Sequence, residues 1–236
     1  MALVPRRCAV HAHADPGTPG EVAPNPGDTP MSVIAAVLAL QAAAVPLDAI
    51  QTYEREAFDR SVTECDRLAA HYDDPEAVTD GVSREAMDLP AAIEACETAV
   101  AADPGNPRLN YQLARAYGYS GQHAAGQPYR DAALTAGYPQ SLFVVGYIRL
   151  MNWDGRGADP CYGGELIRLS GRAGRFAGLV GFPHYALIGL FEGCESYPVI
   201  DEAEMLAFLD RAEAQTEDFY RAALITQLRD RIEDQP

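Results

Sequence analysis

Residues 103–121 read DPGNPRLNYQLARAYGYSG, and this stretch decides the fold. Proline cannot continue a helix, so the Asp103-Pro104 pair ends one helix, and Asn106-Pro107 suits the start of the next. The apolar residues that follow share one helical face at the i, i+4, i+7, i+8 spacing: Leu109, Leu113, Ala116 and Tyr117. The stretch therefore predicts a turn between two helices, the second of them amphipathic.

The chain after residue 48 repeats this alternation of amphipathic stretches and short Gly/Pro/Asp turns. Alanine, leucine and arginine dominate its composition, while runs of β-branched residues are scarce. Two later stripes have helical spacing, namely Met205, Phe208, Leu209 and Ala212, and then Tyr220, Leu224, Leu228 and Ile232. We expect an all-α fold with at least seven helices after residue 48 and no sheet of three or more strands.

Small residues recur at a nearly regular interval along these helices. If the helices form pairs, the small residues in the second helix of each pair lie 34, 40 and 39 residues apart, at Ala99, Ala133, Ala173 and Ala212. In the expected first helices they lie 32 and 43 residues apart, at Ala114, Gly146 and Gly189. A small residue at a fixed place lets two helices approach closely, and such a period indicates a helical solenoid.

The stretch 103–121 resembles the first helix and turn of a tetratricopeptide repeat, with Ala132-Ala133-Leu134 and Pro139 in roughly the expected places. Residues 141–178 resemble a Sel1-like repeat, and a third, weaker unit covers 185–214. The marks of the Sel1-like unit are Val145-Gly146, the turn Gly155-Arg156-Gly157, Asp159, Arg172-Ala173 and Ala177-Gly178. The resemblance implies antiparallel helix pairs stacked as a short solenoid over residues 88–236, after a helical lead-in at 45–87.

Two features depart from the repeat pattern. Pro128 falls inside an expected helix, which predicts that this helix starts late or is kinked. The Gly-rich segment 174–183 is interpreted as an insertion between repeat units.

The N-terminal region has the composition of a tail followed by an export signal. Residues 1–30 contain six prolines and almost no apolar periodicity, which predicts disorder. Residues 31–44 have the length and apolar character of a signal-peptide core and end in small residues. Basic residues lie far upstream, so Met31 is a possible true start, and a buried helix is the alternative to a signal. We predict a periplasmic or secreted protein without a membrane span after cleavage, with a cytoplasmic location as the alternative.

Beyond Cys8 in the tail, the chain has four cysteines. An even number in an exported chain indicates two disulfide bonds, for which three connectivities exist. Because repeat proteins contact mainly their sequence neighbours, we favour Cys65–Cys96 and Cys161–Cys194. No C-x-x-C pair occurs, so the sequence does not predict a zinc ribbon or a thioredoxin-type site.

The sequence contains no recognisable catalytic or metal-binding constellation. The formal charge of −16 argues against a nucleic-acid partner, which requires a basic face. His11 and His13 resemble an H-x-H metal pair but lack the strand and the distant ligands of such a site. The other histidines are scattered at His71, His123 and His184, and Trp153 is interpreted as a packing anchor. We therefore predict no catalytic residues, no metal and no cofactor.

The tetratricopeptide resemblance places one set of side chains on a concave groove formed by first helices: Arg108, Tyr111, Arg115, Tyr119 and, further along, Tyr147. Arginine recognises carboxylates, and tyrosine supplies contact area, so this groove is the candidate binding site for a protein or peptide. The alternative is that Arg108 and Arg115 neutralise nearby acids on a solvated face. On the groove hypothesis, Arg115→Ala weakens partner binding and scarcely alters stability.

Three functions are compatible with this sequence. We favour a non-catalytic binding scaffold of the bacterial envelope. The alternatives are a regulatory or accessory part of an enzyme system with an unfamiliar site, and a structural envelope protein. A polar pocket that brings a histidine beside carboxylates favours the enzyme system, whereas a continuous groove lined by Tyr111, Arg115 and Tyr147 favours the scaffold.

Overall fold

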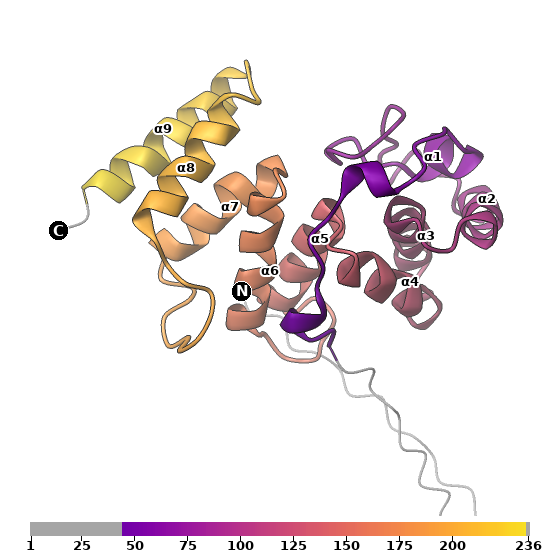
Figure 1. The fold of residues 1–236 in the computed structure, drawn as a ribbon, viewed down its shortest axis with the longest axis horizontal. Helices are drawn as coiled ribbons and strands as arrows, with labels where there is room; N and C mark the ends of the chain where they lie inside the picture. Colours follow the sequence, from indigo (N-terminus) through magenta and orange to yellow (C-terminus); the bar gives the residue numbers. More distant parts are fainter. Residues whose placement is uncertain (1–43, 235–236) are drawn as a thin grey trace, which may run out of the picture. The chain divides into compact units, whose positions relative to one another are not determined.

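The computed structural model describes residues 44–234, and every regular element among them is helical. The α-helices, which follow one another in Figure 1, are α1 Glu64–Ala69, α2 Leu89–Ala102, α3 Pro107–Tyr119, α4 His123–Thr135, α5 Pro139–Leu150, α6 Pro160–Arg172, α7 Phe176–Leu187, α8 Glu202–Glu213 and α9 Phe219–Glu233. Two 3-10 turns precede them, η1 Leu47–Ala49 and η2 Arg55–Ala57. The predicted all-α class is confirmed for this part of the chain. The predicted tail at 1–30, with Cys8, His11 and His13, and the predicted signal peptide at 31–44 lie outside the described residues, apart from Ala44.

The turn residues of the sequence mark the helix starts. Asn106 caps α3, because its side-chain oxygen accepts a hydrogen bond from the main-chain N–H of Arg108, and Pro107 occupies the first helical position. Proline also opens α5 and α6. Aspartate side chains cap α2, α6, α8 and α9, at Asp88, Asp159, Asp201 and Asp218.

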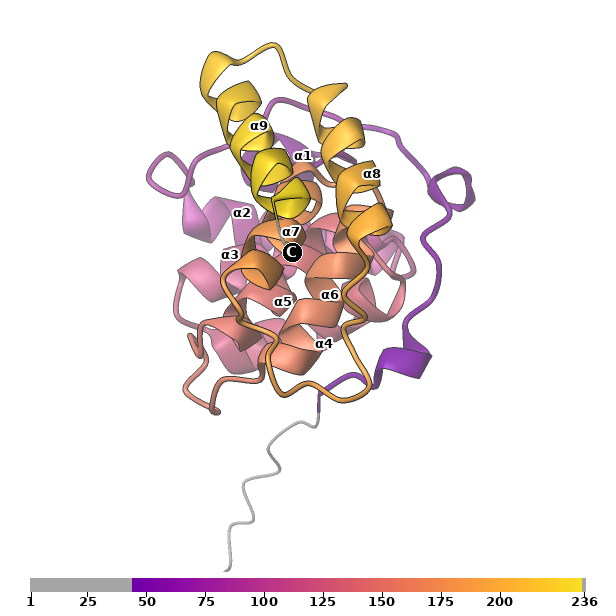
Figure 2. The same ribbon diagram turned by 90° about the vertical axis from the view of Figure 1, so that its left-hand side faces the viewer.

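Each helix packs mainly against its neighbours along the chain, and α7 also contacts α9. Figure 2 shows α8 and α9 side by side at the C-terminal end. Two crossings depend on glycine: a Cβ atom on Gly163 would lie 2.7 Å from the carbonyl oxygen of Gly146, and one on Gly178 would lie 2.5 Å from the nitrogen of Gly171. The backbones of α5 and α6, and of α6 and α7, therefore meet directly at these points.

The helix after α6 begins earlier than the sequence pattern indicated. The segment 174–183 is not an insertion, since α7 starts at Phe176 and includes most of it. Gly189 lies after the end of α7 with a φ of +75°, and Ala173 is the exposed C-cap of α6, so neither is a helix-crossing residue. Residues 176–187 are almost all apolar or glycine, so no amphipathic stripe marked this helix.

The helix that contains Pro128 does not start late. It begins at His123 and continues through Pro128. Proline leaves the Ala124 carbonyl without its helical partner, but Ala124 and Pro128 are both exposed, so water can satisfy that carbonyl.

The described helices enclose two main apolar clusters. The predicted stripe of α3 lies in the first, beside Cys65 and Cys96 of α1 and α2. The predicted stripe of α8 lies in the second, where Phe182 and Phe191 pack against it. For α9 the prediction was partly wrong, because the buried residues are Ile225, Leu228 and Ile232, while Tyr220 and Leu224 are exposed. As the last helix, α9 has only one covered face.

Both disulfide bonds have the predicted pairing. Cys65–Cys96 joins α1 to α2, and Cys161–Cys194 joins α6 to the segment after α7. They connect positions 31 and 33 residues apart. In the chain-entropy description, each loop of this size stabilises the fold by about 4 kcal/mol.

The lead-in at 45–87 was expected to be helical and is mostly not. Apart from the six residues of α1 and the two 3-10 turns, it is irregular. Its main-chain groups bond to side chains and turns of the helical part instead, and these contacts define the candidate functional site.

Candidate functional site

The predicted groove residues of α3 are interior residues. Arg108, Tyr111 and Arg115 are only 3%, 5% and 7% exposed. The prediction that they form an open groove is therefore wrong for these three residues. Tyr119 is half-buried, with the guanidinium groups of Arg84 and Arg115 each 5.1 Å from its ring centre.

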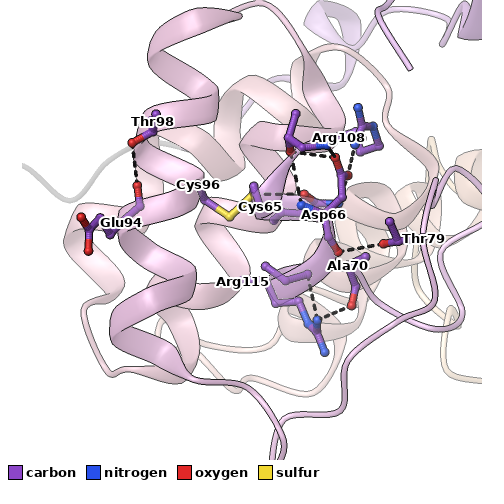
Figure 3. The surroundings of a disulfide bond; sticks show 12 residues. Cys65, Asp66, Ala70, Thr79, Glu94, Cys96, Thr98, Arg108 and Arg115 are labelled. Atoms are coloured by element: carbon purple, nitrogen blue, oxygen red, sulfur yellow. Dashed lines mark hydrogen bonds and ion pairs between the residues drawn. A yellow bond between two sulfur atoms is a disulfide. The ribbon is translucent and has the colours of Figure 1, made fainter. Parts of the chain in front are cut away.

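Arg108 holds the chain that precedes and begins α1. Its Nη1 atom donates to the fully buried carboxylate of Asp66, and the two side chains point toward each other in Figure 3. Its Nη2 atom donates to the carbonyl oxygens of Asp59 and Ser61, both at 3.3 Å. Gln112, one turn further along α3, donates to the same carboxylate at 2.9 Å. This arrangement pairs a buried charge with its counter-ion and additional donors.

Arg115 binds the main chain on the far side of α1. Its Nη1 atom donates to the carbonyl oxygens of Ala69 at 2.9 Å and Ala70 at 2.8 Å, and its Nη2 atom donates to that of Val82 at 2.7 Å. Figure 3 shows Arg115 beside Ala70. The side chains of α3 therefore recognise an irregular segment through its backbone. The sequence did not indicate that residues 59–82 lie over α3, because this segment has no clear helical or strand periodicity.

A second irregular stretch, residues 44–62, is called the N-terminal strap below, and it is the indigo segment of Figure 1. The main-chain N–H of Gln51 donates to the carbonyl of Thr135 at 2.8 Å, and the hydroxyl of Tyr162 donates to the carbonyl of Val45 at 2.7 Å. At Gly137, whose φ is +67°, a Cβ atom would lie 2.1 Å from the Gln51 carbonyl oxygen. The α4–α5 turn thus has glycine where the strap passes.

The strap also places apolar side chains on the helices. Val45, Leu47 and Ile50 pack against a cluster of fully buried side chains that includes Leu142 of α5 and Leu166 of α6. Further along, the ring of Tyr53 meets that of Tyr138 edge to face, with centroids 5.5 Å apart. The only sequence signal for this contact was apolar or aromatic residues at 45, 47, 50 and 53 in a segment without helical period.

The loop of residues 71–77, called the acidic loop below, fixes the far end of the strap. Glu76 is buried and accepts hydrogen bonds from Arg55, with Nε at 3.1 Å, and from Arg60 at 2.7 Å. Asp74 accepts from the hydroxyl of Tyr138 at 2.7 Å and from the main-chain N–H of Glu76 at 3.0 Å. Burial raises the pKa of Asp74 to about 6.

A polar network continues from this loop towards α7. Gln140 donates to the hydroxyl of Tyr111 at 3.2 Å and accepts from Nε of Arg175, which is buried with its guanidinium 4.1 Å from the ring centre of Phe143. His71 lies near Arg115 and Arg175, and burial together with these two charges lowers its pKa to about 4. Its Nδ1 atom accepts from the main-chain N–H of Asp73 at 3.0 Å. A histidine held neutral in this way is poorly matched to proton transfer at neutral pH.

Asp74 gives the network a testable pH dependence. The pKa of Asp74 in the folded protein, about 6, exceeds its usual 3.8. Its contribution to the free energy of unfolding is therefore fully present below about pH 4 and is lost as the pH rises through 6. His71 has the opposite effect, because its pKa is lowered in the folded protein: its contribution to the free energy of unfolding increases as the pH rises from about 4 to its usual 6.5. We expect Asp74→Asn to raise the free energy of unfolding by about 3 kcal/mol at pH 8 and by almost nothing at pH 4.

Urea unfolding of the wild type and the Asp74→Asn variant, measured at the same series of pH values, checks this result. His71 is common to both proteins, so the difference between them reports Asp74 alone. A variant that is less stable than the wild type at pH 8 would show that the charged carboxylate stabilises the fold.

Part of the helical surface beyond the strap carries aromatic side chains, called the aromatic patch below. Phe143 stacks on Tyr147 with centroids 6.0 Å apart, and Tyr147 meets Trp153 edge to face at 4.8 Å. Tyr147, the last predicted groove residue, is half-buried. Trp153 is 69% exposed, so the interpretation of this residue as a packing anchor was wrong.

A cavity of about 670 Å³ lies between the strap and α6. Its size is within the usual range of roughly 300–1,000 Å³ for small-molecule sites. Leu47, Ile50, Leu142 and Leu169 form its apolar lining, and most of the remaining lining residues are polar, namely Asp48, Gln51, Thr52, Tyr53, Glu165, Arg172 and Tyr197.

Residues 44–234 contain no group of three or more His, Cys, Asp or Glu side chains placed to hold a metal ion. No helix within the same range is long and apolar enough to cross a membrane.

The chain was compared with known proteins in three ways. No family model, no curated protein and no solved structure matches it.

Proposed function

We propose that this protein is a non-catalytic scaffold that binds a protein or peptide, built from tetratricopeptide/Sel1-like helix pairs stacked as a short solenoid. The observation that supports this most is how α3 holds the chain that covers it. Arg108 and Arg115 donate to five main-chain carbonyl oxygens, four of them on non-helical residues and the fifth on Ala69, the last residue of α1. Side chains of a helix that bind an irregular backbone use the same interactions with which a groove recognises a peptide.

The location that fits this function is the bacterial envelope. Two disulfide bonds in one chain are typical of proteins that fold in an oxidising compartment. The predicted signal peptide at 31–44 supports the same location. In that setting the disulfides hold the helices together while a partner binds.

The aromatic patch is the part of the surface proposed to contact the partner. The buried α3 side chains that were predicted for this role are covered by the chain itself, whereas Tyr147 of α5 is half-buried and Trp153, in the turn after α5, is exposed. Exposed tryptophan and tyrosine side chains contribute strongly to protein interfaces, because they bury a large area at a small entropic cost.

Trp153→Ala should reduce capture of the partner from an envelope extract at least tenfold. An exposed side chain contributes little to folding, so we expect the stability of this variant to change by less than about 0.5 kcal/mol. The matched control is Phe219→Ala on α9, since Phe219 is 75% exposed and lies outside the patch. The measurement is quantitative mass spectrometry of proteins retained by each immobilised form.

Two results would contradict the proposal. Equal capture by Trp153→Ala and by the wild type would exclude the aromatic patch as the interface. Retention of no protein above the background of an inert column by the wild type would argue against a binding scaffold.

A further inference from the structure

The strap and the surface beneath it differ in burial. None of the residues 44–62 is buried, although Val45, Leu47 and Ile50 contact the helices. Leu134, Leu142 and Leu166 beneath them are 0–2% exposed. The strap thus lies on the surface as a bound peptide does, and it covers apolar side chains that would otherwise face water.

The contacts of the strap are also those of a peptide ligand. Within residues 45–58, two of them involve the backbone, at Val45 and Gln51, and do not depend on the identity of the side chains. Its apolar side chains at 45, 47 and 50 and the ring of Tyr53 provide selectivity. At the far end Arg55 pairs with the buried Glu76. Extended peptides are recognised by this combination of main-chain bonds and spaced side-chain contacts.

The cavity beside the strap leaves room for a second chain. One of its walls consists of strap residues from Leu47 to Tyr53, and another includes Leu169 and Arg172 of α6. Leu142, which belongs to the cluster beneath the strap, also lines this cavity. An incoming segment can therefore contact the apolar floor before the strap leaves.

We propose that the surface of α4–α6 beneath the strap is an exchangeable site for an extended segment of a partner protein, occupied here by the protein's own residues 45–58. The partner segment has aliphatic side chains at the relative spacing of Val45, Leu47 and Ile50, a tyrosine at the position of Tyr53 and an arginine at that of Arg55. This proposal rests on the proposed binding function and names a second site for it, separate from the aromatic patch.

The probe for this site is a fluorescein-labelled synthetic peptide with the sequence of residues 44–58, AVPLDAIQTYEREAF. In the wild type the tethered strap competes with this peptide at an effective concentration in the millimolar range. The double variant Leu47→Asp/Ile50→Asp removes the apolar contacts of the strap and leaves the helices unchanged. We expect the variant to bind the peptide at least tenfold more tightly than the wild type does, as measured by fluorescence anisotropy.

Two controls test whether the peptide occupies the strap site. A peptide with the same two aspartate substitutions should not bind either protein. Adding Tyr162→Phe to the double variant removes the donor to the Val45 carbonyl and should weaken peptide binding at least threefold. Circular dichroism and intact disulfides confirm that each variant is folded.

A second measurement uses the wild type alone. Unlabelled peptide added to ¹⁵N-labelled protein should accelerate hydrogen exchange of the Gln51 amide, which bonds to Thr135, and leave exchange within α3 unchanged.

The proposal would be overturned by equal peptide affinity in the wild type and the double variant, or by binding of the aspartate-substituted peptide as tight as that of the original peptide. A wild-type dimer that Leu47→Asp dissociates would assign the site to a second copy and overturn it as well. None of these tests depends on the capture of a partner through Trp153. The strap proposal can therefore fail while the proposed binding function holds, and the binding function can fail while the strap proposal holds.

Discussion

Replacing Arg108 with alanine should lower the free energy of unfolding by about 4 kcal/mol. The carboxylate of Asp66 is fully buried, and Arg108 supplies its counter-charge. Without the guanidinium, Asp66 retains hydrogen bonds from Gln112 and Thr63 but no cation. Removing one member of a buried ion pair is costly, because the remaining charge has lost its hydration.

Denaturant unfolding of Arg108→Ala checks this value, and a double variant tests its cause. Asp66→Asn/Arg108→Met removes both charges while it keeps similar side-chain volumes. It should recover most of the lost stability, since the penalty arises from an unpaired charge and not from the absence of a salt bridge. A loss below 1 kcal/mol in Arg108→Ala would be inconsistent with a buried pair.

Arg115→Ala should also destabilise the protein by about 4 kcal/mol. From the sequence alone we expected this change to affect binding and not stability, and the structure gives the opposite expectation. Arg115 is 7% exposed and donates to the carbonyl oxygens of Ala69, Ala70 and Val82. The substitution leaves these acceptors without their charged donor, and the end of α1 and the segment that follows it lose this attachment to α3.

Arg84→Ala is the matched control for this prediction. Arg84 and Arg115 both place their guanidinium groups 5.1 Å from the ring centre of Tyr119, but Arg84 is exposed. We expect Arg84→Ala to change stability by less than about 0.5 kcal/mol. Similar losses in the two variants would mean that the stacking on Tyr119, and not the carbonyl contacts, carries the effect.

The helices that the sequence predicted best are those with clear local signals. Asn106-Pro107 begins α3, and Leu109, Leu113, Ala116 and Tyr117 form its buried stripe, as the spacing indicated. The start of α7 was missed because Phe176 to Leu187 is apolar on every side and has no stripe to detect. Periodicity reports the difference between two faces of a helix, so it fails where both faces are apolar.

The groove prediction shows a second limit of local patterns. Helical spacing correctly placed Arg108 and Arg115 on a face separate from that of Leu109 and Leu113. It could not distinguish a face in contact with water from one covered by irregular chain, because arginine is compatible with both. The spacing in sequence between these arginines and the carbonyl groups they bind is 33–49 residues.

The sequence by itself therefore determined the helical class and the start of α3, and it favoured the pairing of the cysteines that the structure has, since these depend on neighbouring residues and on short loops. The tertiary structure alone decided that residues 44–87 cover the helices, and that Asp66, Asp74 and Glu76 are buried. An irregular segment finds its place only through the surface that satisfies its main-chain groups, and that surface exists only after the helices have packed.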